Sequence, residues 1–266
     1  MDFYHLHVKS WFSFLRGGSS PDDLAEKAAQ LGFTALSLTD HMGLYGIQRF
    51  HKACAKFDVK PITGAEITLC NGLKLVLIAL NHEGYRNLCS LLTKSHLENR
   101  LDPIVSTEDL NCYNTGLICL SGGSNSIIWN WIKNDKTTLL QQSVDLLLNI
   151  FVSRFYIEII NHLNQGEFHL AKKLYRWSES NNLNSIATND VYHTSKDDYL
   201  RCDLLNCIRL GIPLNEFHID RRLNDEAYLK TQQEMLQNIP NSDLLSKTTD
   251  IVDQVDLDLL NDRVTA

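Results

Sequence analysis

The stretch that decides the fold is a short apolar run that ends in two ionisable residues, Thr34-Ala35-Leu36-Ser37-Leu38-Thr39-Asp40-His41. A helix signal precedes this run. Ser20 can cap a helix, Pro21 fits its first turn, and Asp23 stands where a capping box places an acid. Apolar residues then recur at helical spacing until a glycine stops them. The order predicts a helix over 21–31 and then a buried strand.

The same alternation of helix and strand signals continues along the chain. Further strands are predicted over residues 60–69, 73–80, 116–120, 155–160 and 185–188. Further helices are predicted over residues 45–56, 83–98, 138–150, 166–180 and 197–209. Repeated units of this kind imply a parallel sheet wrapped by helices, and its closed form places chemistry at the carboxyl ends of the strands. We therefore expect an α/β barrel.

The pattern changes after residue 212. Residues 1–212 are expected to form the barrel, and residues 213–266 a polar helical extension with helices over 226–236 and 243–255. The extension ends without any closing motif and reads as the start of something longer. No linker or low-complexity stretch interrupts the barrel region.

Bulk composition limits the function classes. The 266 residues carry a net charge of -7, so no global basic field exists to hold a nucleic acid backbone, and any DNA contact must be local or lent by a partner. The seven cysteines are odd in number and contain no CxxC pair, as expected for reduced thiols. No secretory signal pattern or membrane-length apolar run is present, which favours a cytoplasmic protein.

Two histidines stand one residue apart near the amino terminus, in Phe3-Tyr4-His5-Leu6-His7-Val8. In a strand, residues i and i+2 project to the same face, so His5 and His7 would share one space and supply half of a metal site. Two solvated histidines on a surface strand would give the same pattern, so the pair alone does not decide between these interpretations.

Carboxylates and further imidazoles fall where strands end. Asp40 and His41 end one predicted strand, Glu66 lies late in the next, and Asp190 follows the last. With His5 and His7 they form a donor set of the kind that holds Zn, Mn or Fe. Such ions would clamp a phosphate and activate water for phosphoester hydrolysis, with Asp40, His41, Glu66 and Asp190 as the catalytic candidates. The alternative is that these residues are ordinary polar groups at a barrel mouth.

Several motifs together resemble a known family. His5-Leu6-His7, Ser13-Phe14-Leu15-Arg16-Gly17-Gly18 and Leu36-Ser37-Leu38-Thr39-Asp40-His41 resemble the PHP (polymerase and histidinol phosphatase) domain. The chain is most similar to the amino-terminal PHP domain of bacterial DNA polymerase III alpha subunits, and within them to the error-prone branch. The motifs that carry this closer likeness are Gly64-Ala65-Glu66, Gly84-Tyr85-Arg86-Asn87-Leu88, Leu120-Ser121-Gly122 and Ala187-Thr188-Asn189-Asp190-Val191.

The resemblance implies a distorted seven-stranded (β/α) barrel with a divalent metal cluster at its mouth. In some members of the family that cluster supports a 3'-5' exonuclease or pyrophosphatase activity. Carried over by motif, the implied metal ligands are His5, His7, His41, Glu66 and Asp190, with Asp40 beside them.

Four positions depart from the family pattern. Arg16 stands where an Asp is usual, and a guanidinium has no lone pair to offer a metal. Lys74 stands in place of a ligand His, and Gly123 in place of a Cys or His. Tyr192 occupies a second ligand position, although the neighbouring His193 could substitute if the backbone turned. A full three-metal site is therefore not expected.

Two functions follow from these observations. In the first, the chain is the PHP module of a polymerase III alpha-like protein, with a degenerate metal site and a mainly structural role, partnered by the rest of that chain and by a proofreading or clamp subunit. In the second, it is a working metal-dependent phosphoesterase that acts on a DNA 3' end or, less in keeping with the motifs, on a small phosphate monoester. The chain carries no carboxylate set for nucleotidyl transfer, so polymerisation is not expected of these residues.

Overall fold

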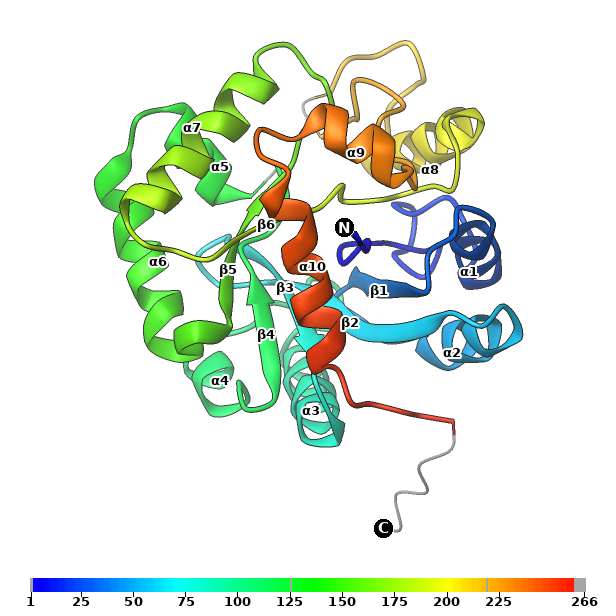
Figure 1. The fold of residues 1–266 in the computed structure, drawn as a ribbon, viewed down its shortest axis with the longest axis horizontal. Coiled ribbons are helices and arrows are strands. Elements are labelled where there is room, and N and C mark those ends of the chain that lie inside the picture. Colours follow the sequence, from blue (N-terminus) through cyan, green and yellow to red (C-terminus); the bar gives the residue numbers. More distant parts are fainter. Residues whose placement is uncertain (1, 125, 219, 261–266) are drawn as a thin grey trace.

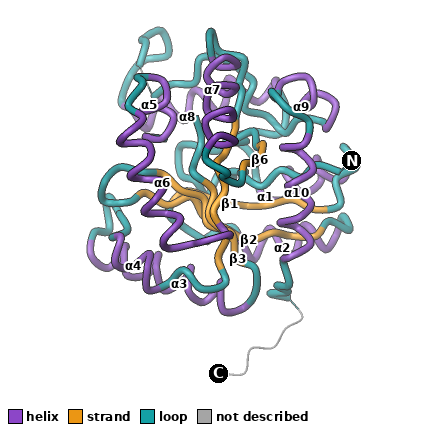
Figure 2. Tube along the Cα trace, turned by 60° about the vertical axis from the view of Figure 1, so that its left-hand side comes forward, coloured by secondary structure: helices purple, strands orange, loops and turns teal. Residues whose placement is uncertain are grey.

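A computed structural model describes residues 2–124, 126–218 and 220–260 of the chain. The strands gather in the middle of the molecule, and helices surround them (Figure 2). One sheet contains six strands in sequence order, and the bounds are β1 Ala35–His41, β2 Lys60–Thr68, β3 Lys74–Ala79, β4 Leu117–Leu120, β5 Phe155–Ile159 and β6 Ser185–Ala187. Each strand lies where the sequence predicts one, and the α/β class is confirmed.

The sheet is mixed rather than wholly parallel. β1 and β2 run parallel, as do β4, β5 and β6, but β3 is antiparallel to both β2 and β4. The expectation of a parallel sheet is therefore wrong for β3. Only five residues, 69–73, separate β2 from β3, and so short a connection allows a hairpin but no helical crossover.

The amino-terminal segment brings the two edges of the sheet together. Val8 forms a parallel bridge with Val191, which follows β6. On its other side the segment accepts hydrogen bonds from β1, where the Ser37 amide donates to the His5 carbonyl at 3.1 Å and the Thr39 amide to the Val8 carbonyl at 2.7 Å. The structure thus has six regular strands, and this segment takes the place of the seventh strand of the expected barrel.

The helices lie outside the sheet (Figure 1). Their bounds are α1 Pro21–Gln30, α2 Ile47–Lys56, α3 His82–Glu98, α4 Thr107–Cys112, α5 Ile127–Lys133, α6 Thr137–Phe151, α7 Glu167–Ser180, α8 Tyr199–Leu210, α9 Gln232–Asn238 and α10 Asp243–Gln254. The Ser20 capping box is confirmed. Two short helices, α4 and α5, were not expected. α9 begins later than predicted because residue Tyr228 bridges His193 in an extended arrangement.

The carboxy-terminal residues pack onto the barrel. α10 crosses close to the amino terminus (Figure 1), where the Tyr4 amide donates to the Thr248 hydroxyl at 2.9 Å. Leu245 and Ile251 of α10 belong to the same buried core as the strands. The division into barrel and extension at residue 212 stays a prediction. Within the residues that the structure describes, no helix could span a membrane.

Candidate metal centre and its internal lysine

Three potential metal ligands converge at one end of the barrel. His7 comes from the amino-terminal segment, Glu66 from β2 and Asp190 from the turn after β6. One ligand atom from each lies within 4.8 Å of the others, and all three residues are buried. Asp190 adopts a left-handed backbone with a φ of 40°, a conformation that Asp tolerates better than most residues. These three residues, called the triad below, form a possible metal-binding group.

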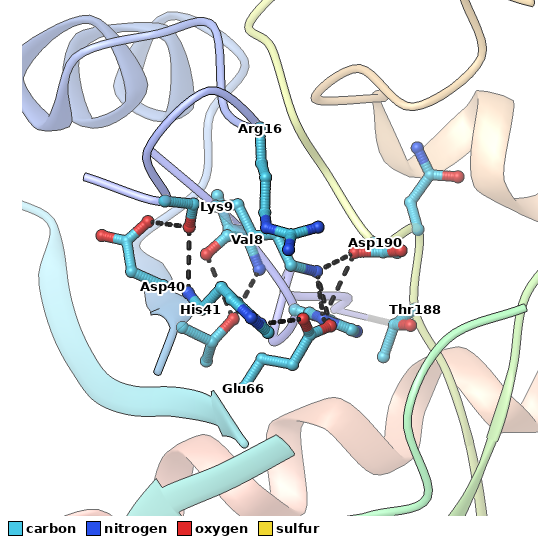
Figure 3. A network of polar contacts seen from close by, with 12 residues as sticks. Val8, Lys9, Arg16, Asp40, His41, Glu66, Thr188 and Asp190 are labelled. Atoms are coloured by element: carbon cyan, nitrogen blue, oxygen red, sulfur yellow. Dashed lines mark hydrogen bonds and ion pairs between the residues drawn. The ribbon is translucent and has the colours of Figure 1, made fainter. Parts of the chain in front are cut away.

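The side chain of Lys9 lies inside the triad (Figure 3). Its Nζ is 2.7 Å from His7 Nε2 and 2.9 Å from Glu66 Oε2, and it also donates to Asp190 Oδ1. An ammonium group has three N–H donors, and the triad offers one acceptor to each. Lys9 is fully buried, and among the described residues its ammonium contacts the three triad atoms and the ring of Tyr192. The ammonium therefore occupies the point on which three metal ligands would converge.

The charges in this cluster stabilise one another. Burial by itself lowers the pKa of Lys9, but Asp190 and Glu66 outweigh burial and raise that pKa above its usual range. Burial likewise favours neutral carboxyl groups, yet Lys9 holds the pKa values of both Glu66 and Asp190 below their usual range. At neutral pH the cluster is a fully ionised group of one cation and two anions.

A second carboxylate fixes the ring of His7 from behind. His7 Nδ1 lies 2.7 Å from Glu158 Oε1, an oxygen that also accepts from the Thr188 hydroxyl. Glu158 favours a second proton on the ring, whereas the Lys9 ammonium opposes it, because a charged ring would place two cations 2.7 Å apart. Burial and Lys9 lower the pKa of His7, but Glu158 and Asp190 outweigh them and raise it to about 9. In this arrangement Nδ1 donates to Glu158.

Two further residues named from the sequence, His41 and Asp40, lie beside the triad, and only His41 contacts it. His41 is half-buried, and its Nδ1 is 2.9 Å from Glu66 Oε1. Asp40 turns away from the triad, because its oxygens accept from the backbone and hydroxyl of Ser10 and from the hydroxyl of Ser13. Asp40 thereby anchors the loop that follows the amino-terminal segment.

The structure does not bring His5 to the triad. His5 Nε2 donates to the Lys230 carbonyl at 2.8 Å, and its ring packs edge-on against Phe3 and Phe33. Burial lowers the pKa of His5 to about 4. The sequence interpretation assumed a regular strand, but two residue steps of β1, from Ser37 to Thr39, lie opposite three residue steps of the amino-terminal segment, from His5 to Val8. This bulge-like offset sends the two histidines in different directions.

His193 also stays outside the triad. Its Nδ1 donates to the Ser195 carbonyl at 2.7 Å, and its ring packs against Tyr199. Burial lowers the pKa of His193 to about 4. The backbone turn that would have let His193 replace Tyr192 as a ligand does not occur.

Three of the residues that depart from the family pattern, Tyr192, Arg16 and Gly123, lie close to the triad or to its cations. The Tyr192 ring centre lies 4.5 Å from the Lys9 ammonium and 3.2 Å from the guanidinium of Arg222. Arg16 points its guanidinium toward the cluster (Figure 3). At Gly123 a Cβ atom would come within 2.9 Å of Asp190 Oδ2, so the Asp190 carboxylate fills space that a side chain there would need.

The donor set as it stands does not fit a divalent metal. All three triad atoms already bind the ammonium of Lys9, and its positive charge repels a second cation at that point. Lys9, Glu158, Arg222 and Thr188 were missed by the sequence reasoning. A signal for Lys9 existed, since a lysine two residues beyond His7 shares its face in an extended segment.

Comparison with known proteins identifies the family of this chain. The family model "PHP domain" matches residues 5–162. The chain belongs to the PHP domain family.

Similar curated proteins include an error-prone DNA polymerase and DNA polymerase III alpha subunits. The chain is 34% identical over 254 residues to the error-prone DNA polymerase of Symbiobacterium thermophilum, covering 89% of this chain and 23% of that protein. It is 29% identical over 260 residues to the DNA polymerase III subunit alpha of Escherichia coli, covering 94% of this chain and 22% of that protein. The chain is thus related to polymerase III alpha subunits and spans less than a quarter of their length.

Among solved structures, a metal-dependent phosphoesterase from Bifidobacterium adolescentis superposes with a TM-score of 0.51. The match covers 70% of this chain and 86% of that one at 12% identity, which shows the shared PHP-type fold.

Proposed function

We propose that this chain is the PHP module of a DNA polymerase III alpha-like protein, in which an internal lysine has replaced the metal and the module acts as structural support. The observation that carries the proposal is the Lys9 ammonium, which contacts one ligand atom of each triad residue. A buried lysine supplies positive charge without the open coordination positions that hydrolysis needs. The carboxylates are therefore used for stability.

The size of the chain relative to its relatives supports the same role. The aligned region is 23% or less of the length of these curated relatives, which are DNA polymerase chains more than four times as long as this one. We infer that the partner is the remainder of a polymerase chain, involved in DNA replication or repair synthesis, and that a proofreading or clamp subunit docks on the assembly.

Metal analysis of the purified chain tests the proposal. We expect the protein to contain Mn, Zn and Fe far below one equivalent, to leave a labelled single strand intact, and to keep its melting temperature after dialysis against a chelator. Stoichiometric metal, together with hydrolysis that is lost in His7→Ala, would overturn the proposal and favour the phosphoesterase. Glu26→Gln, on the exposed face of α1, is the matched control, because it removes an ionisable group remote from the triad.

A further inference from the structure

A cavity of about 180 Å³ opens beside the triad, beyond Tyr192 and Arg222. Its walls come from the amino-terminal loop, the first residue of β3, the inner side of α8 and the segment before Arg222. The volume is several times what one buried water needs. The cavity is lined by Arg16, Lys74, Tyr192, Tyr199, Cys202, Asp203, Asn206, Arg209, Asp220 and Arg222.

Cations outnumber anions around this cavity. Arg16, Lys74, Arg209 and Arg222 face two carboxylates, Asp203 and Asp220. Asp203 is neutralised from outside by Arg221, whose guanidinium donates to both of its oxygens, at 3.0 and 2.6 Å. This excess of positive charge occurs in a chain of net charge -7, so it is a local feature.

The cations that face the cavity have unused hydrogen-bond donors. Across residues 2–124, 126–218 and 220–260, the side chains of Arg16 and Lys74 form no hydrogen bond or ion pair. Arg222 is held by stacking on Tyr192 at 3.2 Å and has one ion pair, with Asp190 at 3.7 Å. That distance leaves the guanidinium without a close acceptor, although it has five N–H donors.

Lys9 binds Glu66 and Asp190 at short range and compensates one of their two negative charges. Arg222, 3.7 Å from Asp190, contributes to the balance of the other, whereas Arg16 and Lys74 form no ion pair with the triad in the described structure. Burial lowers the pKa of Arg209, and so does the positive charge of the neighbouring Arg16, although Asp220 opposes this effect. An anion in the cavity would relieve the repulsion between Arg16 and Arg209.

We propose that the cavity lined by Arg16, Lys74, Arg209 and Arg222 binds a phosphate group without the help of a metal ion. Guanidinium forks match phosphate oxygens in two-point contacts, and a lysine adds a point charge. The group comes from free phosphate, from a nucleotide or from a DNA strand, and these sources share one recognition chemistry. The proposal goes beyond the structural role above and does not depend on it.

Calorimetric titration of the full chain tests this site with three probes: inorganic phosphate, a deoxynucleoside monophosphate and a short single-stranded oligonucleotide. We expect saturable binding that Arg16→Gln and Lys74→Gln each weaken by roughly tenfold, the loss expected for one charge-assisted contact. Their melting temperatures should stay at the wild-type value, because neither side chain has a partner in the described structure. If the oligonucleotide binds more tightly than the other two probes, and salt weakens its binding, the phosphate group comes from a DNA strand.

Arg100→Gln is the matched control, since Arg100 is exposed and follows α3. This variant should bind like the wild type. The proposal is overturned if no probe binds at millimolar concentration, if both cavity variants bind unchanged, or if Arg100→Gln weakens binding as much as they do.

Discussion

Replacing Lys9 by methionine removes the central cation of the triad and changes little else. Methionine has nearly the length of lysine and fills the same buried path, so the substitution deletes a charge without opening a large cavity. Glu66 and Asp190 would then face each other with no cation inside the triad. We expect Lys9→Met to be folded but strongly destabilised.

The magnitude follows from the distances. Lys9 Nζ lies 2.9 Å from Glu66 Oε2, which at an effective dielectric constant of about 20 corresponds to an attraction of about 6 kcal/mol. Part of this is offset because the variant no longer buries an ammonium group. Breaking one side of a buried ion pair costs about 3–5 kcal/mol, and we expect the free energy of unfolding to fall by that amount.

The dependence on pH separates this charge effect from a packing effect. In the wild type the pKa values of Glu66 and Asp190 are lowered, so the stability that they provide is present above the ordinary carboxyl range and is lost as pH falls. Without Lys9, burial raises both pKa values, and protonation on acidification relieves the penalty. The difference between variant and wild type should therefore shrink from pH 7.5 to pH 5.

Urea unfolding followed by circular dichroism measures these differences. Lys94→Met is the matched control, because Lys94 pairs with Asp109 but its side chain is 48% exposed, and we expect its unfolding curve to overlay the wild type. If Lys9→Met unfolds within about 0.5 kcal/mol of the wild type at pH 7.5, the ammonium does not hold the triad together and the reasoning is refuted.

Three further predictions test the site and its surroundings. Mn²⁺ or Zn²⁺ should raise the melting temperature of Lys9→Met but not that of the wild type. At a metal concentration a hundredfold above Kd the stabilisation is about 2.7 kcal/mol. Equal responses of the two proteins would contradict the replacement of the metal by lysine. In His5→Gln, unfolding measured at pH 7.5 and pH 5 should show less acid sensitivity by about 2 kcal/mol. The unfolded chain binds a proton at His5 below the usual pKa of 6.5, whereas the folded chain binds one only near pH 4. Between these two pH values protons favour the unfolded state, so the wild type loses stability there. Gly123→Ala should lower the free energy of unfolding by about 1–3 kcal/mol, because its Cβ would lie 2.9 Å from Asp190 Oδ2. An unchanged urea midpoint would show that this carboxylate is free to move.

Much of the fold was predictable because its signals are local. The capping box at Ser20 and the apolar periodicity of α1 depend on residues within one or two turns, and both occur as predicted. The position of each strand follows from short apolar runs in the same way. The direction of β3 was missed although the sequence carried a signal for it, since the short connection between the two predicted strands allows a hairpin but no helical crossover.

The sequence by itself included His7, Glu66 and Asp190 in a larger set of candidate ligands, because strand ends of one sheet meet at one edge, and the folded chain brings these three together. Only the tertiary structure decided what binds them. The one-residue offset between the amino-terminal segment and β1 turns His5 into the core, and Lys9 meets the triad instead. The spacing of His7 and Lys9 indicates a shared face, but hydrogen-bond register, which is set by residues distant in sequence, turns that face toward Glu66 and Asp190, and only the folded chain shows it.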